Sequence, residues 1–337
     1  MLVTVQETTE LLVKLFCQSG LSRDRAKKSA HTLVVAEVWG IGSHGLLRMP
    51  VYLDRLEAGG FAPDANLEVQ SDTGPLVVLS GDGGLGLWQA HDAAILAVER
   101  AGQFGIGLAA VRDSGHCGAL GVFAAEIAER GCVGVLMSSG PAVMPPWGGR
   151  QRLLSTSPIA AAFPAPNAPA LIDLSLSTVA RGKIAALARS GKELPEGWAL
   201  DTSGKPTTDP VEALSGMLAP LGGAKGFALA YMVESITAGL FGPSLSSEVT
   251  DFFAEDSYAK PQGIAHVVLA LDPKIFDVSN KVPASARLDD LGCRTVEAGG
   301  RVPGSRRKPL ARIVASDTFE IDDRLWSELQ SRLRNSY

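Results

Sequence analysis

From about residue 74 onward, short apolar runs that resemble β-strands alternate with longer runs that resemble amphipathic helices. Apolar periods of two and of 3.6 residues favour strands and helices respectively, so strands and helices should follow one another along the chain. Such an order is typical of a sheet covered by helices, and we predict a mixed α/β fold. The strand-like runs are PLVVLS, GIGLAAV, VGVLMSS, PIAAAFPA, ALIDLSL and IAHVVLALDP, and the helix-like runs are LWQAHDAAILAVERAG and GVFAAEIAERG.

Gly81, Gly83 and Gly86 fit the Gly-x-Gly-x-x-Gly spacing of a dinucleotide-binding turn. Such a turn normally requires an acid about 20 residues further on, at the end of a second strand, to bind the ribose hydroxyls. Here the acid, Asp113, comes later, and the motif stands behind more than 70 residues of mostly helical sequence. We therefore interpret these glycines as a structural turn that leads into a helix.

The composition is that of a globular protein with room for one large domain or two. Of the 337 residues, 46% are hydrophobic and 20% are charged, and the formal net charge is −5. The acidic balance and the lack of a basic cluster argue against nucleic acid as a partner. The most apolar long run, GFALAYMVESITAGLFG, contains Glu234 and is too short to span a membrane.

Cysteine and histidine spacing gives no sign of a metal site or of a disulfide framework. The cysteines lie far apart without a Cys-x-x-Cys pair, and no two histidines have the spacing of metal ligands. The first residues lack the basic region of a signal peptide. We therefore expect a cytoplasmic protein without a metal. The cysteines are Cys17, Cys117, Cys132 and Cys293.

Both ends of the chain have helical patterns. Three helix-like runs precede residue 61, and the amphipathic tail 322–337 could pack back on them. We predict a helical domain made of residues 1–70 together with 305–337, attached to a mixed α/β core of residues 71–304.

The stretch GSHGLLRMPVYLDRLEAGG could carry chemistry. If the chain is helical from His44 onward, His44, Arg48 and Tyr52 share one face. The guanidinium can bind a carboxylate with two parallel hydrogen bonds, the imidazole can transfer a proton, and Tyr52 or Ser43 can orient either group. A helix that starts beside Pro50 would break this spacing, and a solvated helix flank is an equal alternative.

His116 lies on a glycine-rich turn between a strand-like and a helix-like run, where side chains often contact ligands. A histidine hydrogen-bonded within its turn is the more common alternative. We interpret the adjacent Cys117 as a packing residue, because the side chains of sequence neighbours usually diverge. His31, His91 and His266 lie within helix or strand patterns and are interpreted as core or surface residues.

Seven stretches, in this order, make the chain resemble the malate/L-lactate dehydrogenase family of NAD(P)-dependent oxidoreductases over nearly its whole length. That family is separate from the Rossmann-type lactate and malate dehydrogenases. It includes ureidoglycolate, sulfolactate and malate dehydrogenases, diketogulonate reductase and reductases of cyclic ketimines. The stretches are SHGLLRMPVYLDRLEAGG, GHCGALG, PPWGGR, LSTSPIAAAFP, DLSLSTVARGKI, LPEGWALDTSGKPTTDP and LGGAKGFALAYMVE.

The resemblance implies a homodimer with a non-Rossmann cofactor-binding region at about residues 120–225. It implies hydride transfer between NAD or NADP and C2 of a small 2-oxo or 2-hydroxy carboxylic acid, such as malate, lactate or sulfolactate. One alternative is reduction of a cyclic ketimine carboxylate, Δ1-piperideine-2-carboxylate or Δ1-pyrroline-2-carboxylate, and another is a non-catalytic relative. The choice between NAD and NADP stays open, because no Rossmann strand is present whose acid or arginine would indicate it.

The resemblance also implies three groups of site residues, and either histidine could be the acid/base. They are His44, His116 and Ser43 as catalytic residues; Arg48, Tyr52 and Thr156 as substrate-binding residues; and Ser139, Asp173, Leu174, Ser175, Lys225 and Gly304 as cofactor-binding residues.

The chain departs from the family pattern at four places. The usual Gly-Thr-Asn-Pro reads Ser-Thr-Ser-Pro at 155–158, which changes the expected pocket shape. Gly115 replaces the usual asparagine before the histidine and so removes an amide that could orient it. The usual Pro-Gly-Glu ends in Ser305 here. Lys183 stands where ketimine reductases often carry an acid, which favours a hydroxy acid as substrate.

Overall fold

A mixed seven-stranded sheet lies at the centre of the computed structural model, which describes residues 1–166, 168–277 and 281–334. The strand order is β2-β3-β4-β11-β5-β6-β7, in which β3 and β4 run parallel and all other neighbours are antiparallel. The predicted mixed α/β fold is therefore confirmed. The strands are β2 (Glu68–Asp72), β3 (Leu76–Ser80), β4 (Ile106–Ser114), β5 (Val133–Ser138), β6 (Ile159–Phe163), β7 (Ala170–Leu174) and β11 (Ile264–Leu271).

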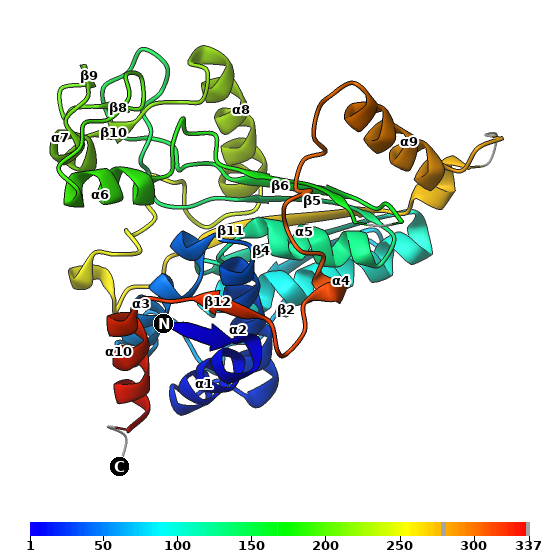
Figure 1. Ribbon diagram of the computed structural model, residues 1–337, viewed down its shortest axis with the longest axis horizontal. Coiled ribbons are helices and arrows are strands. Elements are labelled where there is room, and N and C mark those ends of the chain that lie inside the picture. The colour runs from blue at the N-terminus through cyan, green and yellow to red at the C-terminus, as the bar shows by residue number, and fades with distance from the viewer. Residues whose placement is uncertain (167, 278–280, 335–337) are drawn as a thin grey trace.

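Two of the expected helices, α4 (Gly86–Phe104) and α5 (Leu120–Glu129), pack against this sheet (Figure 1). The buried side of α4 consists largely of alanines, whose small side chains let the helix lie close to β4 and β11. α5 is buried along nearly its whole length. The alanines of α4 are Ala90, Ala93, Ala94, Ala97 and Ala101.

The glycine-rich segment before α4 is a structural turn. The amides of Gly81 and Gly83 donate to backbone carbonyls at the end of β4, at 2.7 and 2.8 Å. A Cβ on Gly86 would lie 2.0 Å from the carbonyl oxygen of Gly115, so only glycine fits there. The interpretation made from the sequence is confirmed, because these donors and this space are used within the fold.

The two ends of the chain pack together beside the sheet (Figure 1). Thr4 and Glu7 form a capping box at the start of α1, and Ser22 caps α2. Trp326 and Leu329 of α10 lie in the same apolar cluster as residues of α1, so the tail packs as expected up to residue 334, and residues 335–337 lie outside the described residues. The elements are β1 (Leu2–Thr4), α1 (Val5–Gln18), α2 (Arg23–Val38), α3 (Met49–Glu57), β12 (Thr318–Glu320), which pairs with β1, and α10 (Asp323–Arg334).

A second lobe lies at the upper left in Figure 1, across the sheet from the N-terminal helices, and has its own apolar cluster. Helix α9 (Ala284–Glu297) stands apart and has no buried residue. Within the described ranges, no helix is long and apolar enough to cross a membrane. The lobe contains α6 (Arg181–Arg189), β8 (Ala199–Leu200), β9 (Pro206–Thr207), α7 (Pro210–Ser215), β10 (Met217–Leu218), α8 (Ala224–Glu234) and the π-turn η3 (Ser235–Gly239); the short helices η4 (Glu255–Ser257), η5 (Pro273–Phe276) and η6 (Leu310–Arg312) lie in connections.

Candidate active site

A cavity of about 460 Å³ opens where the N-terminal helices, the sheet and the second lobe meet. Most of the site residues predicted from the sequence line this cavity, although they come from distant parts of the chain. Tyr52, Lys225 and Gly304 are not among the lining residues. The nominated residues that line it are Ser43, His44, Arg48, His116, Ser139, Thr156, Asp173, Leu174 and Ser175.

The segment that carries His44 and Arg48 is not one helix. It consists of two short 3-10 turns, η1 (Gly42–His44) and η2 (Leu46–Arg48), and α3 begins only at Met49. The regular i, i+4, i+8 spacing is therefore wrong. Glu37 of α2 supports the segment instead, because its Oε1 accepts a 2.6 Å hydrogen bond from the Leu46 amide.

His44 and His116 stack inside the cavity, with ring centroids 5.9 Å apart and planes inclined by 20°. The amide of Gly118 donates to Nδ1 of His116 at 3.2 Å, and the Tyr52 hydroxyl lies 2.5 Å from the same nitrogen. An amide can only donate, so Nδ1 carries the lone pair and Nε2 carries the proton of the neutral ring. Tyr52 is fully buried behind His116, so it contacts the ring rather than the cavity.

Burial, followed by the positive charge of Arg48, lowers the pKa of His44 to about 4. Burial, followed by Arg48, also lowers the pKa of His116 well below its ordinary value. Both rings are therefore neutral in the free protein at pH 7. Arg48 keeps its charge, since burial lowers its pKa only to about 10.

Arg48 has donors available for a ligand. Its Nε donates to the Ser43 carbonyl at 2.6 Å, and its guanidinium lies over the ring of Phe253 at 4.2 Å. Among the described residues it forms no ion pair, because the nearby carboxylate of Asp251 pairs with Arg181 at 3.0 Å. A charged guanidinium in this setting can bind a carboxylate with two hydrogen bonds.

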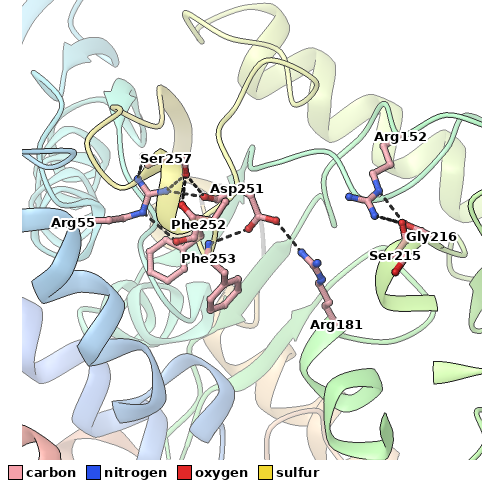
Figure 2. Close-up of polar contacts among 10 residues, drawn as sticks. Arg55, Arg152, Arg181, Ser215, Gly216, Asp251, Phe252, Phe253 and Ser257 are labelled. Atoms are coloured by element: carbon pink, nitrogen blue, oxygen red, sulfur yellow. Dashed lines mark hydrogen bonds and ion pairs between the residues drawn. The ribbon is translucent and has the colours of Figure 1, made fainter. Parts of the chain in front are cut away.

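Sequence reasoning missed several residues of the cavity. Phe252 and Phe253 come from a connection without periodic pattern, and the Phe252 ring lies 4.7 Å from that of His116. Arg181 of α6 faces Asp251 across the cavity wall (Figure 2). Arg307 could have been predicted as a site residue, since it closely follows the Pro-Gly-Ser turn that the sequence had already singled out. Phe252 and Phe253 lie near no such motif.

The end of the cavity beside β7 is suited to an anionic cofactor. Nη1 of Arg307 is buried without a hydrogen-bond acceptor among the described residues, 3.7 Å from Oδ2 of Asp173. Helix α5 starts in the cavity wall, and Ala119 gives it no side-chain cap. The Asp173 contact is a long ion pair, so Nη1 of Arg307 still has a proton to donate, and such a donor beside a helix N-terminus favours phosphate oxygens.

Gly304 contributes to the cavity indirectly, by forming the turn that positions Arg307. Its φ is +78°, and a Cβ there would lie 2.6 Å from Cβ of Leu171, so only glycine fits. The carbonyl of Gly304 accepts a 2.8 Å hydrogen bond from the Arg307 amide. Lys225 lies in the first turn of α8 and is exposed outside the cavity.

The altered Ser-Thr-Ser-Pro motif forms a strained turn that places Thr156 in the cavity wall. Ser157 has a φ of +44°, a conformation that asparagine tolerates better than serine. The hydroxyl of Ser155 accepts a 3.0 Å hydrogen bond from the Ser157 amide and so supports the turn.

The remaining histidines and Cys117 have structural places, as the sequence indicated. His266 is buried, with Nδ1 2.9 Å from the Ser138 hydroxyl and Nε2 3.0 Å from the Gly115 carbonyl oxygen. Burial raises the pKa of the Cys117 thiol to about 12, which suits a packing residue. His31 and His91 flank the carboxylate of Glu126 between helices. No cluster of metal-ligand type was found in the described part of the chain.

Residues 3–330 match the sequence profile of the family described as malate/L-lactate dehydrogenase. The chain belongs to this family. It is 35% identical to the (2R)-3-sulfolactate dehydrogenase (NADP(+)) of Chromohalobacter salexigens, over 98% of this chain and 97% of that one. It is 33% identical to the Δ1-pyrroline-2-carboxylate/Δ1-piperideine-2-carboxylate reductase of Pseudomonas aeruginosa, over 98% and 99%.

The fold agrees with this family. The solved sulfolactate dehydrogenase of Methanocaldococcus jannaschii superposes with a TM-score of 0.89 at 28% identity, covering 100% of this chain and 97% of that one. The relatives are dehydrogenases and reductases, so this member of the malate/L-lactate dehydrogenase family is an NAD(P)-dependent oxidoreductase.

Proposed function

We propose that the protein catalyses reversible hydride transfer between NAD or NADP and C2 of a small 2-oxo or 2-hydroxy carboxylic acid. The observation that carries this proposal is the guanidinium of Arg48, which forms no ion pair with the described residues, beside the stacked rings of His44 and His116. A carboxylate bound by Arg48 would bring its neighbouring C2 carbonyl next to those rings. Holding a reactant in this way can contribute several kcal/mol, on the order of 7–11 in favourable cases.

The nicotinamide cofactor, when bound, supplies or accepts the hydride. Arg307, with the cofactor candidates Asp173, Leu174 and Ser175 of β7 and its exit, supports cofactor binding at that end of the cavity. Ser139 lines the same cavity, and its hydroxyl accepts a 2.9 Å hydrogen bond from Ala265. Lys225 and Gly304 remain predicted contacts: Gly304 would act through Arg307, and Lys225 would have to reach the cofactor from outside the cavity.

The protein's own groups can control the proton. Arg48 lowers the pKa of both histidines, so a substrate carboxylate that offsets its charge raises those pKa values again. Protonation of His116 would thereby be coupled to binding of the oxo acid, and Nε2 would deliver the proton to the developing alkoxide. The Tyr52 hydroxyl donates to Nδ1 of the neutral ring. In the imidazolium Nδ1 carries a proton, so the Gly118 amide must release it and the Tyr52 hydroxyl becomes its acceptor.

A panel of oxo acids and cyclic ketimine carboxylates, each with NADH and NADPH, tests the proposal. We expect faster turnover of an oxo acid with a second anionic group, such as oxaloacetate or sulfopyruvate. The cavity is rich in cations, with Lys183 and Arg181 lining it besides Arg48. Faster turnover of Δ1-piperideine-2-carboxylate would favour the ketimine alternative, and failure to bind either reduced cofactor in a fluorescence titration would refute both.

We also infer a cytoplasmic homodimer. Unpaired cysteines suit a reducing compartment, and exposed apolar side chains on α8 and after it, Leu229, Tyr231 and Leu240, suit a subunit contact. The shared apolar cluster of the two chain ends supports the division into a helical domain of residues 1–70 with 305–337 and a core of residues 71–304. Light scattering on the purified protein tests the dimer, and a monomer at micromolar concentration would contradict it.

A further inference from the structure

Arg55 is a fully buried cation without an acidic partner. It lies on α3, and among the described residues its guanidinium forms no ion pair. Its hydrogen bonds all go to one connection, residues 251–260, which we call the aromatic loop (Figure 2). A buried charge is costly unless its donors are satisfied, so this many bonds to one segment strongly fix that segment. The acceptors are the carbonyls of Asp251 (2.7 Å), Phe252 (3.1 Å), Lys260 (3.2 Å) and Ser257 (3.4 Å), and the hydroxyl of Ser257 (3.0 Å).

The aromatic loop reaches the site through three consecutive residues. The carboxylate of Asp251 pairs with Arg181 of α6. The Phe252 ring lies 4.7 Å from His116 and 5.2 Å from Tyr52, and therefore covers the proposed proton donor. The Phe253 ring lies 4.2 Å from the guanidinium of Arg48.

Arg55 thus holds the backbone of the two phenylalanines whose rings pack against His116 and Arg48. Phe252 keeps water from His116, and Phe253 limits the orientations open to Arg48. We propose that Arg55 is a positioning residue for the reaction: by fixing the aromatic loop it sets the solvation of His116 and the aim of Arg48. This inference rests on the proposed function, since it assigns a consequence to the same two groups.

The test is Arg55→Lys, which keeps the charge but loses the planar set of donors. The substrate is the fastest oxo acid of the panel above. We expect kcat/KM to fall by up to about 100-fold, as small misplacements at a reacting centre can cause. KM for the oxo acid should rise, and the Kd of the reduced cofactor should not change. The apparent pKa in the pH profile of kcat/KM should move to higher pH, because water reaches His116 and stabilises its charged form.

Arg152→Lys is the control, at an exposed arginine. Arg152 also donates several hydrogen bonds to one turn, to the carbonyls of Ser215 (2.7 Å) and Gly216 (2.9 and 2.5 Å), and that turn does not line the cavity (Figure 2). This variant should lose thermal stability and keep KM and the pH profile of the wild type.

Ser257→Ala serves as the second variant and decides the question if Arg55→Lys does not fold. It removes the hydroxyl that accepts from Arg55 and donates to the carbonyls of Asp251 and Ala254, and it leaves the four carbonyl acceptors of Arg55 in place. Its pH profile and KM should change in the same direction, to a smaller extent. If the folded variants lose stability but keep the wild-type KM and pH profile, Arg55 is only structural and the inference is wrong. If the wild type itself turns over no oxo acid, the proposed function fails instead.

Discussion

Replacing Tyr52 with phenylalanine removes one hydroxyl and leaves a ring of nearly the same shape. In the free protein the lost contact is the 2.5 Å hydrogen bond to Nδ1 of His116, and Gly118 still donates to that nitrogen. Because no bare acceptor results, the free energy of unfolding should fall by only about 1 kcal/mol. The catalytic rate is affected as well, because the His116 ring becomes charged before it delivers its proton.

A hydrogen bond to a charged group contributes about 1.5–3 kcal/mol, against about 0.5–1.5 for a neutral pair. The difference, about 1–1.5 kcal/mol, corresponds to a roughly tenfold lower kcat for Tyr52→Phe. Initial rates of NAD(P)H oxidation measure this, with Tyr231→Phe as the control, since Tyr231 lies on α8 and does not line the cavity. A kcat equal to that of the wild type would refute the assignment of His116 as proton donor supported by Tyr52.

Three further predictions concern charge. Arg48→Lys should raise KM for the oxo acid and lower kcat/KM about 100-fold, because the two parallel hydrogen bonds are lost; a KM that rises for the cofactor instead would contradict this. With NAD(P)H saturating, kcat/KM for reduction should increase steadily as pH falls from about 8 to about 5. Proton donation needs the imidazolium, and burial lowers the pKa of His44 to about 4 and lowers that of His116 as well. A plateau in kcat/KM below pH 6.5 would contradict this prediction. Burial alone would raise the pKa of Glu126, but the hydrogen bonds of His31 and His91 outweigh it and lower that pKa from 4.5 to about 2. The carboxylate therefore adds about 3 kcal/mol to the free energy of unfolding above pH 4.5, and this stability is lost as pH falls toward 2. Urea unfolding of Glu126→Gln should show less of this acid-induced loss, and an unchanged slope with pH would refute it.

The sequence predicted the elements well where a pattern repeats. The alternating runs from residue 74 became β3, α4, β4, α5 and β5 in order, since buried strands and amphipathic helices leave regular apolar spacing. The glycines before α4 could also be interpreted correctly, because a dinucleotide turn makes a second demand that the chain does not meet.

The geometry of the site could not be predicted in the same way. His44 and Arg48 come together through two 3-10 turns that rest on Glu37, and no local pattern encodes that support. Phe252 contacts His116 from a point 136 residues further along the chain, held there by Arg55. Such contacts depend on tertiary packing, which the spacing of residues along the sequence does not predict.

The departure at Gly115 shows how the fold offsets a lost side chain. A Cβ at this position would lie 2.2 Å from Cε1 of Phe61, so no larger residue fits while Phe61 fills that space. The turn is oriented from outside instead. The side-chain oxygen of Gln262 accepts a 2.9 Å hydrogen bond from the His116 amide, and His266 binds the Gly115 carbonyl. These two bonds hold the backbone of the turn that carries His116, and the ring itself is held by Gly118 and Tyr52, so the turn keeps its place without a side chain at position 115.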